Sequence, residues 1–253
     1  MKKKICLAGI VVCSLLFLFS GYQIYLDYAE AKEHMEEFKQ LAEMAEQWKR
    51  GMPEKPFCDE DGMLPDYAEL YRKNPDMAGW IFIEGTTINY PVMHTPDAPD
   101  FYLNHNFDKE YSSFGVPYAA GECSMEEPSD NIIIYGHHMR GGRMFGALMD
   151  YTDKGFYESH KIIRFDTVTE KAEYEIAAVF KTTVYDNEGF KYYQFVNAGK
   201  EEDFQAYVEE CKSLALYDTG VTAGYGDKLI TLSTCEYSRR NGRLVIVAKK
   251  ITE

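Results

Sequence analysis

Residues 229–249 read LITLSTCEYSRRNGRLVIVAK, which is two apolar runs separated by a short polar stretch. The runs 229–235 and 244–249 each have the length and the β-branched content of a strand. Asn241 and Gly242 form a dipeptide that is typical of a tight turn between antiparallel strands. The stretch therefore predicts two neighbouring strands, with Cys235 at the end of the first and Arg243 at the start of the second.

The same alternation of short strands and turn signals extends upstream to about residue 66. It predicts strands over 79–83, 88–93, 131–135, 162–166 and 172–184, and short helices over 66–72, 144–151 and 201–216. Seven or eight strands in about 185 residues indicate a mainly β domain, a closed or nearly closed β-barrel with helical insertions. We assign this domain to residues 67–253.

Composition excludes several classes of protein. Hydrophobic residues make up 45% of the 253 residues and aromatic residues 15%, which is too much for a disordered chain. Lys and Arg number 27 against 41 Asp and Glu, giving a net charge of -14. A nucleic-acid partner is excluded because phosphate binding requires clustered cations.

The N-terminal 26 residues have the pattern of a membrane anchor. No charged residue occurs from 5 to 26, and these residues would form a helix about 33 Å long, enough to cross a bilayer. Lysines at 2–4 and acids from Asp27 onward orient the N-terminus toward the cytoplasm. A cleaved signal peptide remains the alternative, with a site near Ala29. Both readings place everything after residue 27 outside the cytoplasm.

Residues 27–66 are interpreted as a juxtamembrane helix followed by a linker. Positions 27–50 lack Gly and Pro and are rich in good helix formers. Residues 51–65 contain three prolines and two glycines, a composition typical of a linker.

The cysteines do not indicate a metal site. Cys58, Cys123, Cys211 and Cys235 follow the predicted anchor without any Cys-x-x-Cys spacing, so a zinc knuckle or a redox pair is not indicated. Disulfides among them remain open. We expect at least one of them to be kept as a free thiol for its chemistry.

Two stretches carry residues suited to catalysis. The predicted strand 131–135 runs into Gly136, His137 and His138, and the strand 229–235 ends at Cys235 with Arg243 beyond. A thiol at a strand end can exchange a proton with an imidazole, and a guanidinium can stabilise an oxyanion. The alternatives to catalysis are structural roles: a buried cysteine, two solvated histidines and an arginine paired with an acid such as Glu236.

Alternation along the strand separates the two histidines. Ile133, Tyr135 and His137 would share one face of the extended chain, and His138 would point the other way. Adjacent histidines that point to opposite faces are also poor metal ligands. His137 is therefore the predicted partner of the thiol.

Together these motifs resemble the sortases, and specifically class B, from about Tyr67 to Lys250. The resemblance is carried by the sequences TLSTC, RLVIVAK and YGHH, and by NPDMAGWI, INYPV and FYLNH further upstream. It implies an eight-stranded sortase barrel and a cysteine transpeptidase on the outer face of a Gram-positive cell membrane. The family cuts LPxTG- or NPxTN-like C-terminal sorting signals of surface proteins through a thioester. The acyl group then passes to an amine of the peptidoglycan cross-bridge or of a pilin, and no cofactor is implied.

The resemblance also implies roles for individual residues. Cys235 would be the nucleophile, His137 the general acid toward the leaving amine, and Arg243 the group that holds the substrate carbonyl or oxyanion. Substrate-binding residues would be Tyr135, Ser233 and Glu236, the last also through its backbone N–H. The seven-residue loop before Arg243 departs from the expected pattern because it adds Arg239 and Arg240 near the site.

Two functions from other classes remain open at this point. One is a membrane-tethered thiol hydrolase that releases its acyl group to water. The other is a non-catalytic barrel that displays a binding surface, in which Cys235 would be inert.

Overall fold

The computed structural model describes residues 2–47, 62–185 and 189–252. Two compact units divide the chain, one up to Gln40 and the other from Leu41 onward. Helix α1 (Lys2–Gln47) makes up the first unit and continues a short way beyond it. The greater part of the predicted linker, residues 51–61, lies outside the described residues.

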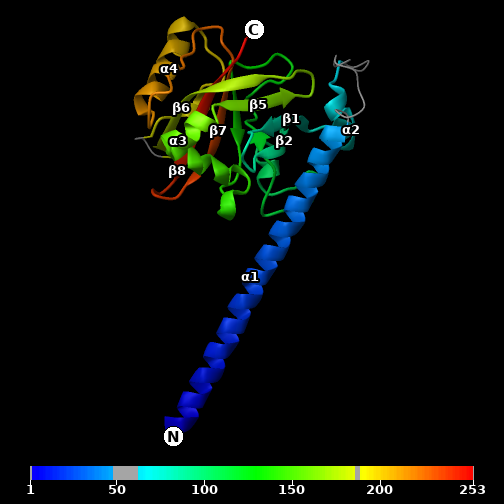
Figure 1. Ribbon diagram of the computed structural model, residues 1–253, viewed down its shortest axis with the longest axis vertical. Helices are drawn as coiled ribbons and strands as arrows, with labels where there is room; N and C mark the ends of the chain where they lie inside the picture. Colours follow the sequence, from blue (N-terminus) through cyan, green and yellow to red (C-terminus); the bar gives the residue numbers. More distant parts are fainter. Residues whose placement is uncertain (1, 48–61, 186–188, 253) are drawn as a thin grey trace. The chain divides into compact units, whose positions relative to one another are not determined.

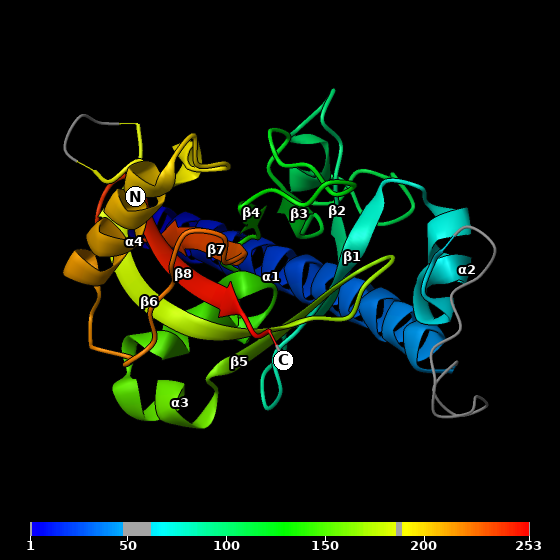
Figure 2. The ribbon, with the colours of Figure 1, turned by 90° about the horizontal axis from the view of Figure 1, so that it is seen from above.

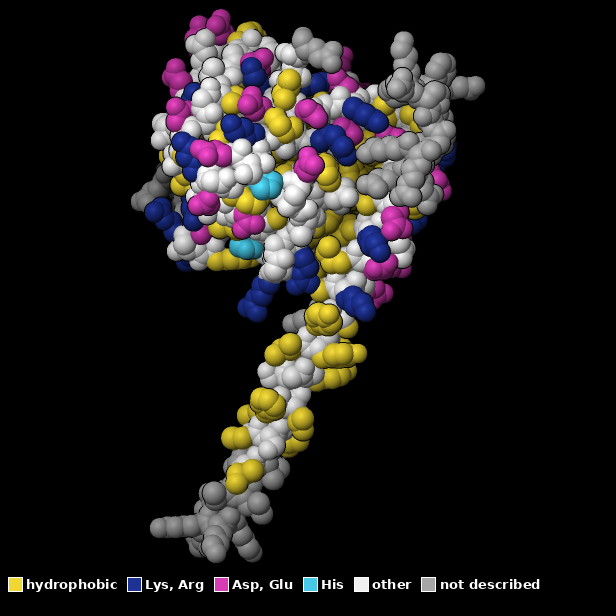
Figure 3. Space-filling view, viewed as in Figure 1, with side chains coloured by type: hydrophobic (Ala, Val, Ile, Leu, Met, Phe, Trp, Pro, Cys, Tyr) yellow, Lys and Arg dark blue, Asp and Glu magenta, His cyan; other side chains and the backbone are white. Residues whose placement is uncertain are grey.

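Large hydrophobic side chains project from the stretch 10–28 of α1, between two-fifths and four-fifths exposed (Figure 3). In the predicted anchor at 5–26, the side chains of residues 5–9 and 11 lie outside the described set. Within the described residues, no helix is both long enough and apolar enough to cross a membrane.

The second unit is a closed β-barrel of eight strands in the described residues, as predicted (Figures 1 and 2). Around the barrel the order is β1-β2-β3-β4-β7-β8-β6-β5. The strands are β1 (Met77–Phe82), β2 (Asn89–Met93), β3 (Tyr118–Ala119), β4 (Asn131–Tyr135), β5 (Ile162–Thr167), β6 (Glu173–Thr183), β7 (Leu229–Glu236) and β8 (Gly242–Lys250).

Short helices connect and cover the strands. They are α2 (Pro65–Lys73), α3 (Lys154–Ser159) and α4 (Glu201–Leu214), with single turns or short runs of 3-10 helix at η2 (Phe101–Leu103), η3 (Arg140–Gly142), η4 (Phe145–Thr152) and η5 (Tyr192–Gln194). The helix predicted at 144–151 is therefore a 3-10 helix. The helix predicted at 201–216 ends two residues early, because the Leu216 amide donates to the Val179 carbonyl on β6.

Strand β7 lies between β4 and β8 in the barrel, and these two pairings decide which strand ends meet. Strand β4 pairs in parallel with β7, and β7 pairs antiparallel with β8. All of β4 except its last residue is buried, as expected for an apolar strand inside a sheet that is covered on both faces. The carboxyl ends of β4 and β7 consequently lie side by side.

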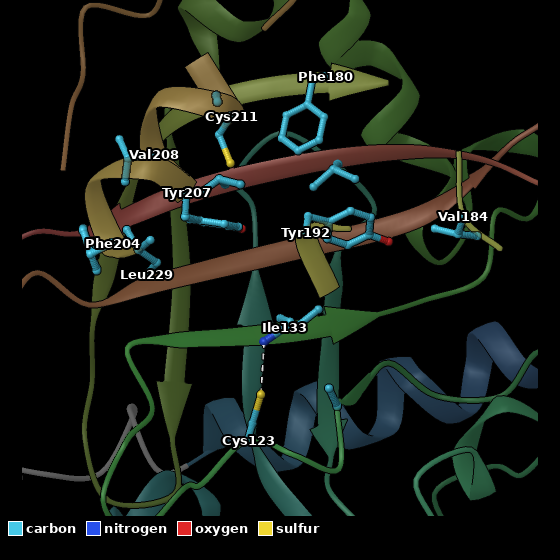
Figure 4. Close-up of a cluster of buried hydrophobic side chains, with 14 residues drawn as sticks. Cys123, Ile133, Phe180, Val184, Tyr192, Phe204, Tyr207, Val208, Cys211 and Leu229 are labelled. Atoms are coloured by element: carbon cyan, nitrogen blue, oxygen red, sulfur yellow. Dashed lines mark hydrogen bonds between the residues drawn. The ribbon is translucent and has the colours of Figure 1, made fainter. Parts of the chain in front are cut away.

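Helix α4 covers one side of the barrel with an apolar face. Phe204, Tyr207, Val208 and Cys211 of this helix are buried against side chains of β6 and β8 (Figure 4). Burial raises the pKa of the Cys211 thiol to about 12. At neutral pH this cysteine is a protonated core residue.

Cys123 is the second buried thiol of this core, on its opposite side in Figure 4. Its sulfur accepts a hydrogen bond from the Ile133 amide and donates one to the Asn131 carbonyl. Cys123, Cys211 and Cys235 are all free in the described residues. Cys58 lies outside them.

Candidate active site

The β7–β8 hairpin places a thiol opposite a guanidinium. Cys235 pairs directly with Arg243 across the two strands. Residues directly opposite each other in a sheet share a face, with Cβ atoms about 5 Å apart. Asn241 closes the loop in the left-handed conformation, with φ at 56°. The hairpin predicted from residues 229–249 therefore sets the spacing of these two groups.

The end of β4 is tied to β7 by hydrogen bonds on both sides of Gly136. The Gly136 amide donates to the Ser233 carbonyl at 3.2 Å, and Thr234 Oγ1 donates to the Gly136 carbonyl at 2.8 Å. A Cβ at Gly136 would lie 2.6 Å from the ring of Phe145, so a larger residue at this position would displace that ring. These contacts fix the chain direction immediately before His137.

A cavity of about 530 Å³ lies where these strand ends meet. Five of the six residues singled out from the sequence line it, namely Tyr135, His137, Ser233, Cys235 and Arg243. A half-buried thiol, an imidazole and a guanidinium thus face one cavity. This set is suited to acyl transfer through a thioester.

The two adjacent histidines have different surroundings. His137 lines the cavity, and its Nε2 atom lies 2.8 Å from the carbonyl oxygen of Leu103. His138 does not line the cavity; its Nδ1 donates to the carbonyl oxygen of Cys235 at 2.8 Å, and its ring lies 5.0 Å from that of Tyr237. The two rings thus have separate surroundings, and only His137 of the pair lines the cavity.

Glu236 was expected among the substrate-binding residues, but its carboxylate lies elsewhere. Its side chain is buried, and its carboxylate accepts hydrogen bonds from the backbone N–H and the hydroxyl of Ser238 and contacts Lys181 Nζ at 3.4 Å. It is absent from the cavity wall. The physical reason is the period of two along β7: because Cys235 faces the cavity, the next side chain points to the other face.

We expect Glu236 to stabilise this loop at neutral pH. Burial alone would raise the pKa of Glu236, but the Ser238 hydrogen bonds and Lys181 lower it below its ordinary value. A lowered folded-state pKa stabilises the protein above the unfolded-state value, and the stabilisation is lost as the pH falls through the folded-state pKa. Glu236→Gln should therefore cost about 1 kcal/mol at neutral pH, after allowing for screening of the partly exposed Lys181.

Thermal melts across a pH series check this prediction. The melting curves of wild type and Glu236→Gln should differ at neutral pH and converge in acid. A difference that grows as the pH falls would contradict the sign.

Sequence reasoning missed other residues that line the cavity. Tyr192 from η5 lies with its hydroxyl 2.6 Å from Ser233 Oγ, and burial raises its pKa to about 12, so it stays protonated at neutral pH. Leu103 from η2 also lines the cavity. The FYLNH motif contained Leu103 but carried no assigned role, and no local pattern marks Tyr192.

The two extra arginines of the β7–β8 loop lie apart from the cavity. Arg239 and Arg240 are exposed, and neither lines the cavity, whereas Arg243 does. The Arg243 guanidinium is oriented by donating from Nη1 to the carbonyl of Gly242 at 2.9 Å.

Comparison with known proteins agrees with this geometry. The sortase domain family matches residues 81–251. Sortase B of Staphylococcus aureus is 31% identical over 253 residues, covering 99% of this chain and 98% of that protein. Sortase B of Listeria monocytogenes is 31% identical over 241 residues, covering 94% and 93%.

Solved structures give the same result. The Staphylococcus aureus sortase B–substrate complex matches with a TM-score of 0.78 and 31% identity, covering 88% of this chain and 99% of that one. Sortase B from Clostridium perfringens matches with a TM-score of 0.66 and 32% identity, covering 73% and 98%. With this barrel and these matches along nearly its whole length, the chain belongs to the sortase family of cysteine transpeptidases, class B.

Proposed function

We propose that Cys235, His137 and Arg243 are the catalytic residues of this sortase. The observation that supports the assignment best is the cross-strand pairing of Cys235 with Arg243 on a cavity wall that also contains His137. The substrate would be an LPxTG- or NPxTN-like sorting signal at the C-terminus of a surface protein. The acceptor would be an amine of the peptidoglycan cross-bridge or of a pilin.

The reaction would proceed in two acyl transfers. The Cys235 thiolate attacks the carbonyl carbon of the scissile threonine, and the Arg243 guanidinium stabilises the resulting oxyanion. His137 then protonates the leaving amine as the carbon–nitrogen bond breaks, leaving a thioester on Cys235. An incoming amine then attacks the thioester carbon, the neutral His137 takes the proton that this amine loses, and the carbon–sulfur bond breaks to release the Cys235 thiolate.

The remaining cavity residues would hold the signal peptide. Tyr135 and Ser233 lie beside Cys235 on the wall, with Tyr192 bonded to Ser233. An extended peptide in the cavity would contact these aromatic and hydroxyl groups. The Glu236 carboxylate would stabilise the loop between β7 and β8 through Ser238, away from the cavity. Any contact of Glu236 with substrate would therefore come from its backbone N–H.

The N-terminal segment would anchor the enzyme in the cell membrane as a single span at residues 5–26. This proposal is supported by the uncharged stretch with lysines at 2–4 on one side, and by the exposed hydrophobic side chains of 10–26. The positive end would lie in the cytoplasm. Residues 27–66 would form the juxtamembrane helix and linker, and the catalytic domain at 67–253 would lie outside the cell.

Removing residues 1–26 should release a soluble enzyme with unchanged activity on peptides in solution, because the proposed anchor contributes no residue to the cavity. Fractionation of cells that express each form, with a peptide cleavage assay on both, measures this. A truncated protein that stays with the membranes would contradict the proposed span, and loss of peptide cleavage would contradict the domain assignment.

Replacing each histidine separately should distinguish their roles. His137→Ala should lower kcat/KM by roughly 10³-fold, because the leaving amine loses its general acid. His138→Ala should cost only several-fold, because it removes a hydrogen bond to the Cys235 backbone. Initial cleavage rates on one peptide decide this; an inactive His138→Ala with a near-wild-type His137→Ala would reverse the assignment.

A panel experiment tests the function itself. The enzyme is incubated with sorting-signal peptides and with oligoglycine or lysine amines, and the products are identified by mass. We expect cleavage after threonine with the amine joined to the new C-terminus. Release of the free acid alone in the presence of excess amine would favour the thiol hydrolase, and no cleavage of any signal would favour the non-catalytic barrel.

A further inference from the structure

His137 makes a hydrogen bond that the two acyl transfers do not use. Its Nε2 atom lies 2.8 Å from the carbonyl oxygen of Leu103. A carbonyl oxygen can only accept, so Nε2 carries a proton and donates it in this contact. The other ring nitrogen, Nδ1, is then the position at which the ring gains and loses a proton.

The chain at Leu103 is held in place by the neighbouring Tyr102, which is fully buried. The Tyr102 hydroxyl accepts a hydrogen bond from Asn74 Nδ2 and donates one to Asp76 Oδ2, each at 2.8 Å. Burial raises the pKa of Tyr102 above its ordinary value, so the phenol stays a donor at neutral pH. Asp76 is in turn paired with Lys109 Nζ at 2.8 Å.

The backbone around the Leu103 carbonyl is restrained as well. The Tyr102 carbonyl accepts from the Val116 amide at 3.0 Å. Gly115 adopts the left-handed conformation, with φ at 57°, and packs against the Leu103 carbonyl. A Cβ at this position would lie 2.6 Å from the Leu103 oxygen, so only glycine fits without a shift. The peptide that binds His137 is thus restrained through the Tyr102 side chain and through the backbone on both sides.

We propose that Tyr102 is a positioning residue for His137. Through the Leu103 carbonyl it holds the imidazole with its proton on Nε2, so that the catalytic proton passes through Nδ1. This inference rests on the proposed function, in which His137 is the general acid.

In this arrangement the proton that reaches the leaving amine comes from Nδ1 of His137. As the carbon–nitrogen bond of the tetrahedral intermediate breaks, its electron pair goes to the leaving nitrogen. The Nδ1–H of the imidazolium gives its proton to that nitrogen, and the ring becomes neutral with Nε2–H still bonded to Leu103. The same hydrogen bond therefore persists through the step and keeps the ring oriented.

Tyr102→Phe removes the hydroxyl and keeps the buried ring. Asn74 Nδ2 retains the Phe107 carbonyl at 2.6 Å, and Asp76 retains Lys109, so no partner is left without a bond. We expect kcat to fall roughly 10-fold with KM within about two-fold, because the cavity wall is kept while the acid loses its alignment.

Tyr67→Phe is the matched control. The buried Tyr67 also donates its hydroxyl proton to an aspartate, Asp166 Oδ2 at 2.7 Å, and Tyr67 does not line the cavity. Both variants lose the tyrosine–aspartate hydrogen bond of a buried tyrosine ring. Comparable thermal melts with an activity loss confined to Tyr102→Phe would separate positioning from general destabilisation.

The direct readout is the tautomer of His137 in the full chain. The protein, labelled with ¹⁵N-histidine and kept in detergent micelles, is studied by two-bond proton–nitrogen NMR correlations. His137→Ala identifies the relevant signals among the six histidines. We expect neutral His137 to carry its proton on Nε2 in the wild type, and a larger Nδ1–H fraction in Tyr102→Phe.

Two results would overturn the inference alone, namely a wild-type Nδ1–H tautomer, or equal kcat for the Tyr102→Phe and Tyr67→Phe enzymes. The wild-type tautomer does not depend on Tyr102→Phe, so an Nδ1–H tautomer would overturn the inference even if that variant does not fold. Wild-type cleavage by His137→Ala would instead overturn the proposed function and this inference together.

Discussion

Cys235→Ala should abolish cleavage of a sorting-signal peptide, with a loss of roughly 10⁴-fold or more in kcat/KM. The reason is that no other described thiol can replace it at the cavity. Cys123 and Cys211 are buried in the core, where burial raises the pKa of each thiol. Without a nucleophile, the imidazole and guanidinium have no acyl group on which to act.

Cys211→Ala is the control for this substitution. It removes a sulfur from the α4 face of the core, so it should lower the melting temperature modestly and leave kcat/KM within about two-fold. Thermal melts of both variants confirm folding. Cleavage near the wild-type rate by folded Cys235→Ala would rule out the thioester pathway.

Arg243→Lys should keep the fold and lose roughly 10²-fold or more in kcat/KM, the scale of removing one oxyanion donor. A guanidinium has a planar set of donors that can bind Gly242 and an oxyanion at once, whereas an ammonium is a flexible point charge. The cross-strand pairing keeps residue 243 opposite Cys235 in both enzymes, so the comparison isolates the change of donor group.

Arg240→Lys is the matched control because it makes the same exchange three residues before Arg243, in the loop that joins β7 to β8. Arg240 is exposed and does not line the cavity, so its exchange should change kcat/KM by less than about two-fold. Kinetics of the two variants on one peptide measure the contrast. An inactive Arg240→Lys beside an active Arg243→Lys would show that the catalytic charge belongs to the loop.

The strand pairing and the face of each strand residue could be predicted because both depend on local patterns. Asn241 and Gly242 indicated the turn that pairs β7 with β8, and the period of two placed His137 and His138 on opposite sides of the chain. That period also separates Glu236 from Cys235. The groove position expected for Glu236 came from family resemblance, and it differs from where its carboxylate lies.

Other parts of the site depend on contacts between distant segments, which local patterns do not encode. Leu103 is 34 residues from His137 in sequence, and Tyr192 is 41 residues from Ser233. Leu103 lies in the connection between β2 and β3, and Tyr192 lies in the connection that follows β6. Strand β3 was not predicted for a different reason. A strand of two residues is too short to show an alternating pattern.

The most direct test of the account is to trap the acyl-enzyme. The full chain is incubated with a sorting-signal peptide in the absence of amine, quenched in acid, digested and analysed by mass spectrometry. We expect the N-terminal fragment of the peptide, ending in threonine, on the digest fragment that contains Cys235, and its loss when an amine is added. Peptide cleavage without any adduct on Cys235, or an adduct on another residue, would contradict the account.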